Sequence, residues 1–220
     1  KNGIGAKAAN IFSSKFVVTV INKGKKYVQV FEDQMRKTNK PKITKSKAKD
    51  SVTIDYTPAY KVFGMESLDQ NDTKNLIEKR TIDASAVTGD KVIVTFNGKK
   101  VATKKFEDYI NLYIGNKTES PRVFVESERW AVAFALNPYP NAVQVSFVNG
   151  IGTEDGGSHV AHVIEPVLNR VVKELSEKHK DLTIRKSYIR DNIIVFVKSV
   201  IENPTFTSQT NSSAVAMTTV

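Results

Sequence analysis

The chain has 220 residues, which suffices for one large domain or two small ones, and its 40% hydrophobic content is enough for ordinary buried cores. It contains no cysteine, which excludes disulfide bonds and thiolate metal sites. The longest apolar runs, residues 16–21 and 193–197, are far shorter than the roughly 20 residues that span a bilayer. No transmembrane segment is therefore predicted.

The charge of the chain favours a polyanionic partner. A net charge of +10 at pH 7 points to nucleic acid, although a solvated surface explains such a charge as well. Lysines that can meet phosphates lie at positions 23, 25 and 26, between residues 37 and 49, and at Lys178 and Lys180. No aromatic residues are interleaved with them, so stacking on single-stranded nucleic acid is not predicted.

The chain opens with KNGIGAKAANIF, two glycines and a lysine directly before a helix-forming run. Gly3 and Gly5 let the backbone approach a ligand closely, the helix from about Ala6 offers unpaired N–H groups, and Lys7 adds a cation. This pattern suits phosphate binding, and a plain glycine turn before a helix explains it equally well. Because neither a Met nor a strand precedes the motif, we interpret the chain as a piece of a larger protein.

The first half of the chain shows alternating strand and turn signals. In chain order these predict a hairpin around residues 22–26, an exposed lysine-rich loop at 37–49, a strand at 51–56 that Pro58 ends, a helix at 71–86 that Gly89 closes, and a strand at 91–96 that turns at Asn97 and Gly98.

A second block starts near Lys104 and contains the strongest helical pattern. Apolar residues repeat at spacings of three and four from Val160 to Leu175, with Ser158 as the expected N-cap. The other predicted elements are a short amphipathic segment at 106–114 and strands at 129–136, 142–148 and 193–197. The order of strand, long helix and strand predicts a crossover unit packed on one face of a mixed sheet.

The histidines and acidic pairs give no catalytic site. His159 and His162 are spaced to share a metal, but no third ligand supports one, so capping or surface roles are predicted for both. Glu154 and Asp155 lie in a glycine-rich turn, where solvation explains them. No catalytic residue and no metal ligand is predicted from this chain.

Four segments, in order across nearly the whole chain, resemble type IIA DNA topoisomerases. NGIGAKAANIFS is similar to the ATP-lid end of the GHKL ATPase fold, YKVFGMESLDQN to the end of its sheet region, VSFVNGIGTEDGGSHVAHVIEPV to the transducer stretch of strand, glycine turn and long helix, and IIVFVKSVIENPTFTSQT to the segment that ends in the Gln-Thr-Lys loop. The wording Asn-Gly-Ile-Gly-Ala-Lys resembles the eukaryotic, viral and phage style rather than that of gyrase. MutL-type repair proteins and heat-shock chaperones lack the ENPTFTSQT segment, so the chain resembles them less.

The resemblance implies an α+β fold with two parts. Residues 1–103 would be the C-terminal part of a GHKL (Bergerat) ATPase domain, and residues 104–220 most of a transducer domain of the ribosomal-protein-like βαβ type. The implied function is ATP-driven passage of one DNA duplex through a double-strand break in another, with this region as a gate that dimerises. The implied partners are ATP with Mg²⁺, double-stranded DNA and a second copy of the chain, with no membrane. The nucleus is implied for a eukaryotic source, and otherwise the cytoplasm of an infected or bacterial cell.

The resemblance also assigns residues. ATP contacts would come from Lys1, Asn2, Gly3, Ile4, Gly5, Ala6, Lys7 and Gln209, and DNA contacts from Lys178 and Lys180. Two departures matter. The family's catalytic glutamate and magnesium-binding asparagine precede the lid and are not in this chain, and Asn211 stands where the family has lysine. The alternative prediction is therefore a catalytically inactive DNA-binding or interaction module derived from the same family.

Overall fold

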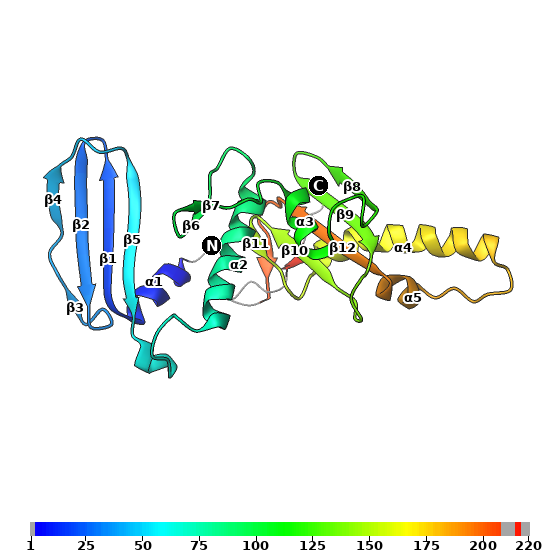
Figure 1. Cartoon of the computed structure of the whole chain (residues 1–220), viewed down its shortest axis with the longest axis horizontal. Helices are drawn as coiled ribbons and strands as arrows, with labels where there is room; N and C mark the ends of the chain where they lie inside the picture. Colours follow the sequence, from blue (N-terminus) through cyan, green and yellow to red (C-terminus); the bar gives the residue numbers. More distant parts are fainter. Residues whose placement is uncertain (1–2, 208–213, 217–220) are drawn as a thin grey trace. The chain divides into compact units, whose positions relative to one another are not determined.

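A computed structural model describes residues 3–207 and 214–216 (Figure 1). The chain divides into two compact units, Lys1–Lys74 and Asn75–Val220. This division precedes the boundary after Thr103 that the resemblance implies, because most of helix α2 (Asn71–Thr88) lies in the second unit and its Ala86 joins that unit's core. The functional boundary after Thr103 stays a prediction. Among the helices of the described part, none is both long and apolar enough to cross a bilayer.

The first unit is an antiparallel sheet preceded by the short helix α1 (Ile4–Ile11). The strands are β1 (Ser13–Asn22), β2 (Lys25–Glu32), β3 (Lys37–Thr38), β4 (Lys42–Lys45) and β5 (Ser51–Pro58). Their order in the sheet is β3-β2-β1-β5, and β4 also pairs with β2. The 3-10 turn η1 (Tyr60–Phe63) follows β5. The predicted hairpin is confirmed: Asn22 pairs with Lys25 across Lys23 and Gly24, both at positive φ. The strand ended by Pro58 is confirmed as β5.

The lysine-rich stretch 37–49 is not simply a loop, and that prediction is wrong in part. It contains β3 and β4, which pair with the ends of β2. Ile43 and Thr44 in β4 are β-branched, and lysines at an exposed edge are compatible with a strand. The high lysine content favoured a loop over these two short strands. The predicted exposure of their side chains is confirmed.

The second unit is built on a mixed sheet of order β11-β10-β12-β9-β8. Its strands are β8 (Arg122–Glu126), β9 (Trp130–Leu136), β10 (Gln144–Val148), β11 (Ile151–Gly152) and β12 (Ile193–Ser199). The predicted crossover is confirmed, because β10 and β12 are parallel and helix α4 (Ser158–Lys178) connects them with the short helix α5 (Lys186–Asp191). Sequence patterns missed β8, which pairs antiparallel with β9.

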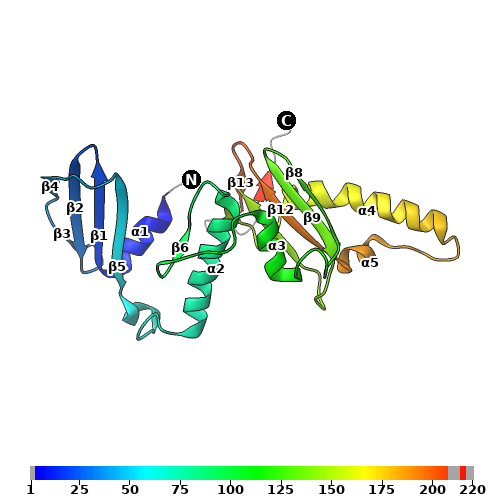
Figure 2. The same cartoon turned by 45° about the horizontal axis from the view of Figure 1, so that its top comes forward.

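Helices cover both faces of this sheet (Figure 2). On one face α3 (Phe106–Ile114) buries Phe106, Tyr109 and Ile110 against the alanines of β9 and against Phe147 and Phe196. On the other face Val160, Ile164 and Leu168 of α4 pack on Val195 and Val197 of β12. The apolar repeat of the long helix thus correctly predicts its buried side. Alternation along β12 gives each face its own set of side chains.

Two further small sheets complete the second unit. The predicted strand at 91–96 is much shorter, since only β6 (Thr95–Phe96) pairs with β7 (Lys99–Lys100), around the predicted turn at Asn97 and Gly98. Near the C-terminal end β13 (Thr205–Phe206) pairs with β14 (Ala214–Ala216).

Candidate functional site

The predicted phosphate-binding turn begins helix α1. Gly3 is its N-cap, with φ 67° and ψ 17°, a left-handed conformation that glycine adopts without steric cost. Residues 3–7 are all exposed, and the first turn of α1 carries no acidic side chain. Its N–H groups and the positive end of the helix are therefore open to an anion. Gly5 differs from Gly3, because a Cβ added at Gly5 meets no atom within 4 Å and its φ is ordinary.

The sheet of the first unit holds this turn in place from the other end of α1. The N–H of Ala59 donates to the carbonyl of Phe12 at 2.8 Å, and the Ser13 hydroxyl donates to the carbonyl of Ala9 at 2.5 Å. The rings of Phe12 and Phe63 lie 5.4 Å apart. The C-terminal end of α1 is thus anchored while its N-terminal end projects its backbone N–H groups. Lys1, Asn2, Gln209 and Asn211 lie outside the described residues.

Helix α1 carries no acidic side chain. The first acidic residue of the sequence is Glu32, in β2. Hydrogen bonds from Asn39 and Lys37, and the charge of Lys37, lower the pKa of its carboxyl below the ordinary value. A lower pKa makes a carboxylate a weaker base. Helix α1 itself therefore offers no carboxylate that could act as a general base.

A second glycine turn begins the long helix α4. The N-cap is Gly157, with φ 143°, so Ser158 is the first helical residue and its prediction as N-cap is wrong. The chain enters the helix one residue earlier because glycine accommodates this backbone conformation. The Ser158 hydroxyl is buried without a hydrogen-bond partner in the described part of the chain.

His159 is buried and not at the surface, which corrects its predicted role. Its side chain is 0% exposed, and its Nε2 lies 3.1 Å from the hydroxyl of Thr153, which in turn contacts the hydroxyl of Ser146. This chain of hydrogen bonds links β10 and the glycine turn to the first turn of α4. Burial lowers the pKa of His159 to about 4. Within the described ranges, no group of three His, Asp or Glu side chains could hold a metal ion.

The buried imidazole predicts a pH dependence of stability. Its ordinary pKa is 6.5, so between pH 6.5 and about 4 the unfolded chain takes up a proton that the folded chain does not. The stability that the neutral His159 imidazole gives the folded chain is therefore fully present above pH 6.5. As the pH falls below 6.5, the free energy of unfolding decreases by at most about 1.4 kcal/mol per pH unit. Urea unfolding at neutral pH and at about pH 5 measures this loss. We expect His159→Gln to show a smaller loss than the parent; an equal loss in both would contradict the assignment.

A buried carboxylate connects α2 to α3. Asp83 is 6% exposed and accepts a hydrogen bond from the Tyr109 hydroxyl at 2.7 Å, while Lys79 and Arg80 lie 2.8 and 3.5 Å from its other oxygen. Arg80 also binds Glu154 in the glycine turn at 2.9 Å. Burial, and then the bond to Asp83, raise the pKa of the Tyr109 hydroxyl, which stays protonated and donates. Sequence patterns missed this network, because its members lie far apart along the chain.

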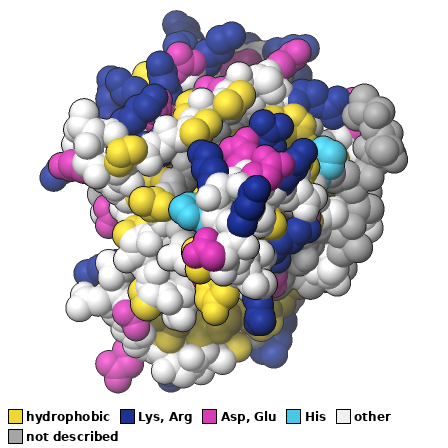
Figure 3. Space-filling view, turned by 90° about the vertical axis from the view of Figure 1, so that its right-hand side faces the viewer, with side chains coloured by type: hydrophobic (Ala, Val, Ile, Leu, Met, Phe, Trp, Pro, Cys, Tyr) yellow, Lys and Arg dark blue, Asp and Glu magenta, His cyan; other side chains and the backbone are white. Residues whose placement is uncertain are grey.

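The predicted DNA-binding lysines lie at the end of α4. Lys178 is in its last turn, Lys180 follows in the connection to α5, and both are exposed. Figure 3, which faces this end of the second unit, shows basic and acidic side chains interspersed. Arg170 pairs with Glu174, and Lys186 and Arg190 approach Glu165. Neither Lys178 nor Lys180 forms an ion pair with a described residue, although Glu174, whose pKa is lowered mainly by its hydrogen bond to Arg170, also feels the charge of Lys178.

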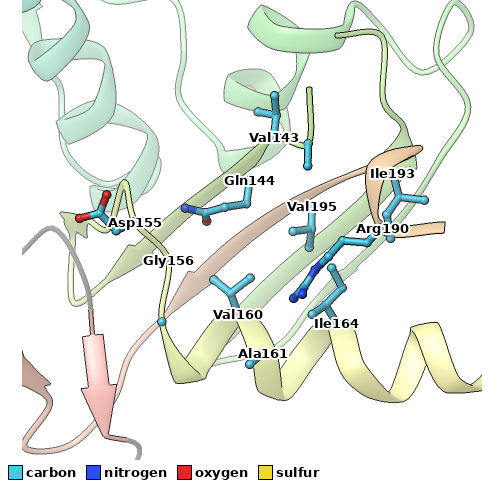
Figure 4. Close-up of a pocket in the computed structure, with 12 residues that line it drawn as sticks. Val143, Gln144, Asp155, Gly156, Val160, Ala161, Ile164, Arg190, Ile193 and Val195 are labelled. Atoms are coloured by element: carbon cyan, nitrogen blue, oxygen red, sulfur yellow. The ribbon is translucent and has the colours of Figure 1, made fainter. Parts of the chain in front are cut away.

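A groove of about 240 Å³ lies between α4 and the edge of the sheet (Figure 4). Val160, Ile164 and Val195 form its apolar wall, Arg190 extends along it from α5, and Gln144 and Asp155 lie at the end near the glycine turn. The amide nitrogen of Gln144 donates to the carbonyls of Thr153 and Glu154. This groove gathers no set of catalytic groups.

A family model described as DNA gyrase B matches residues 85–215, more than half of the chain. The chain belongs to this family of type II DNA topoisomerases. It is 36% identical to DNA topoisomerase 2 of Arabidopsis thaliana over 97% of its length, and 38% identical to a probable DNA topoisomerase 2 of Dictyostelium discoideum, also over 97%. The DNA topoisomerase 2 of Acanthamoeba polyphaga mimivirus is 36% identical over 96%. The resemblance to the eukaryotic and viral members is thus confirmed.

Solved structures support the same fold. The ATPase region of Saccharomyces cerevisiae topoisomerase II matches 99% of this chain with a TM-score of 0.85 and 35% identity, and the chain covers 56% of that structure. The ATPase and transducer domains of DNA topoisomerase II from Balamuthia mandrillaris match with a TM-score of 0.90 and 28% identity, at the same coverage. These matches confirm the predicted α+β class. The chain spans only 15%, 14% and 17% of the three curated relatives.

Proposed function

We propose that this chain is part of an ATP-hydrolysing type II DNA topoisomerase and works in its ATP-operated gate. That enzyme would pass one duplex through a transient double-strand break in another. The observation that carries the proposal is the open glycine turn at the start of α1, which suits phosphates, in a chain whose curated relatives are named DNA topoisomerase 2.

ATP fits the residues that the chain offers. The exposed backbone from Gly3 to Lys7 presents N–H groups at a helix N-terminus without a competing carboxylate. Lys7 adds a positive charge, and we propose that Lys1, Asn2 and Gln209 complete the contacts. Bound ATP would supply the free energy of binding and hydrolysis that closes and reopens the gate. The chain's own residues bind and orient the phosphates.

Mg²⁺ has no matching site among the described residues, since no suitable ligand cluster occurs there. We therefore assign no step of the proposed function to the metal. No step is assigned to a general base either, because helix α1 carries no acidic side chain. The alternative, an inactive module that binds DNA or another protein, stays open for the chain on its own.

The chain by itself is expected to release no phosphate from ATP. Its turn holds phosphates but lacks a group that accepts a proton from water, and such catalysis contributes typically a hundredfold or more. A coupled phosphate-release assay on protein free of contaminating ATPase measures this. Turnover above the buffer blank that also disappears in Gly5→Ala would contradict the expectation.

Duplex DNA and a second copy of the chain are the proposed partners. Lys178 and Lys180 would contact phosphates, so Lys178→Gln with Lys180→Gln is expected to weaken duplex binding and to reduce the salt slope of log K by about 2, roughly one unit per lost contact. Titrations at several salt concentrations measure the slope. Lys61→Gln with Lys117→Gln is the control of equal charge, and equal slopes in both double variants would count against the assignment. For a eukaryotic source we propose the nucleus, and otherwise the cytoplasm of an infected or bacterial cell.

The proposal is tested by gate closure in the complete protein that carries this chain. Sedimentation with a non-hydrolysable ATP analogue should show dimerisation of the N-terminal region that does not occur without nucleotide. The same oligomeric state with and without the analogue would exclude an ATP-operated gate and would favour the inactive module.

A further inference from the structure

One end of the sheet in the first unit concentrates positive charge. We call it the lysine end: the end that holds the β1–β2 turn, β4 and the connection from β4 to β5, at the top of the sheet in Figure 1. Its seven lysines are all exposed: Lys23, Lys25, Lys26, Lys42, Lys45, Lys47 and Lys49. They come close together because β2 lies between β1 and β4, with Lys25 directly opposite Lys45 in the register.

Acidic side chains do not neutralise the lysine end. Its one carboxylate, Asp50, accepts a hydrogen bond from the backbone N–H of Lys23 at 3.1 Å and one from Asn22 at 3.5 Å, so it stabilises the turn. Within the described part of the chain, none of the seven ammonium groups forms an ion pair. A strong positive potential therefore remains at this end.

The opposite end of the same sheet is different. There Lys37 pairs with Glu32 at 3.1 Å, and Arg36 lies 3.8 Å from Asp33. Two basic residues at that end are thus paired with carboxylates, although Lys15 is not, whereas none of the seven lysines at the lysine end is paired with a described residue. A basic surface needed only for solubility would not require this asymmetry.

The lysine end also disfavours folding. Like charges directly opposite each other on neighbouring antiparallel strands are destabilising, and Lys25 faces Lys45 in this way. Lys26 and Lys42 lie on the other side of the sheet, because successive side chains alternate. Charge therefore surrounds the end of the sheet on both faces, and an anion that binds there would relieve the repulsion.

We propose that the lysine end binds the phosphate backbone of duplex DNA, at a surface separate from Lys178 and Lys180. The choice of DNA among polyanions rests on the proposed function. A duplex fits better than a single strand, because single-strand binding uses exposed aromatic side chains for stacking. Tyr27, the aromatic residue next to these lysines, is half-buried and bonds to Gln29. The binding would depend on the phosphate charges and not on the base sequence of the DNA.

The test compares Lys25→Gln with Lys45→Gln against the control Lys61→Gln with Lys117→Gln in the complete protein. Both double variants lose two exposed lysines, and the control lysines lie outside the lysine end. The probes are two short duplexes of unrelated sequence and one single strand of equal length, without nucleotide. We expect the lysine-end variant alone to bind the duplexes about tenfold more weakly at low salt, with a salt slope smaller by about 2. Its thermal midpoint should equal or exceed that of the parent.

Three results would overturn the inference: equal slopes in the two double variants, a strong preference between the duplexes, or tighter binding of the single strand. Gate closure by the ATP analogue is measured separately on the same variants. If the gate closes normally and the slope does not change, the lysine end is not a DNA contact and the proposed function stands. If the slope changes as expected and no gate closes, the DNA contact stands without the proposed function.

Discussion

Gly5→Ala is expected to stabilise the first unit and to weaken nucleotide binding at the same time. Alanine favours the helical backbone by up to about 1 kcal/mol over glycine. A Cβ at this position meets no atom of the chain within 4 Å, so folding imposes no penalty. If the phosphates approach the backbone here, that Cβ will displace them. Losing one charge-assisted N–H contact, worth about 1.5–3 kcal/mol, lowers affinity about tenfold or more.

Gly64→Ala is the matched control. Gly64 also faces open space, but its φ of 64° is left-handed, so alanine there is expected to cost about 1 kcal/mol of stability. Binding of a fluorescent ATP analogue to the complete protein should weaken only in Gly5→Ala, while urea unfolding should show lower stability only in Gly64→Ala. Unchanged nucleotide affinity in Gly5→Ala would show that the turn does not hold phosphates.

Asp83→Ala is expected to destabilise the second unit strongly. The substitution leaves Lys79 and Arg80 without their shared carboxylate and the buried Tyr109 hydroxyl without its acceptor. Removing one partner of a buried ion pair costs about 3–5 kcal/mol, and we expect the lower part of this range because both basic side chains are about half exposed. Urea unfolding followed by fluorescence of the one tryptophan, Trp130, measures the loss.

Asp69→Ala is the control for this prediction, because Asp69 pairs with Lys74 at 2.8 Å at the surface. Exposed pairs contribute about 0–1 kcal/mol. Asp83→Asn keeps an acceptor for Tyr109 and should lie between the two. A loss in Asp83→Ala no larger than that in Asp69→Ala would show that the network does not connect α2 to α3.

Local patterns predicted the elements that depend on neighbouring residues. The hairpin turn at Lys23 and Gly24 needs positive φ, and α4 has an apolar repeat that continues for most of its length. Pairing between distant strands could not be predicted in this way. β12 lies between β9 and β10, although β9 and β10 are closer in sequence. The short run Val123-Phe124-Val125, rich in β-branched and aromatic residues and bounded by charged residues, is a usable strand signal for β8.

The site residues likewise fall into those that local sequence predicts and those that depend on distant packing. The open turn from Gly3 to Lys7 could be predicted, since glycines before a helix report directly on backbone conformation. Burial of His159 and Asp83 could not, because each depends on which face of its helix packs on a sheet formed by other segments. For His159, the preceding pair Gly156 and Gly157 places the first helical turn against Thr153. Polar residues in such positions are visible only once the fold is known.

The most direct test of an ATP-operated strand-passage enzyme is a relaxation assay on supercoiled plasmid with the complete protein that carries this chain. The account predicts relaxation in the presence of ATP and Mg²⁺, no relaxation without ATP, and a strongly reduced rate in Gly5→Ala at limiting ATP. Relaxation that proceeds equally without ATP, or none under any condition from a folded protein that binds duplex DNA, would contradict it.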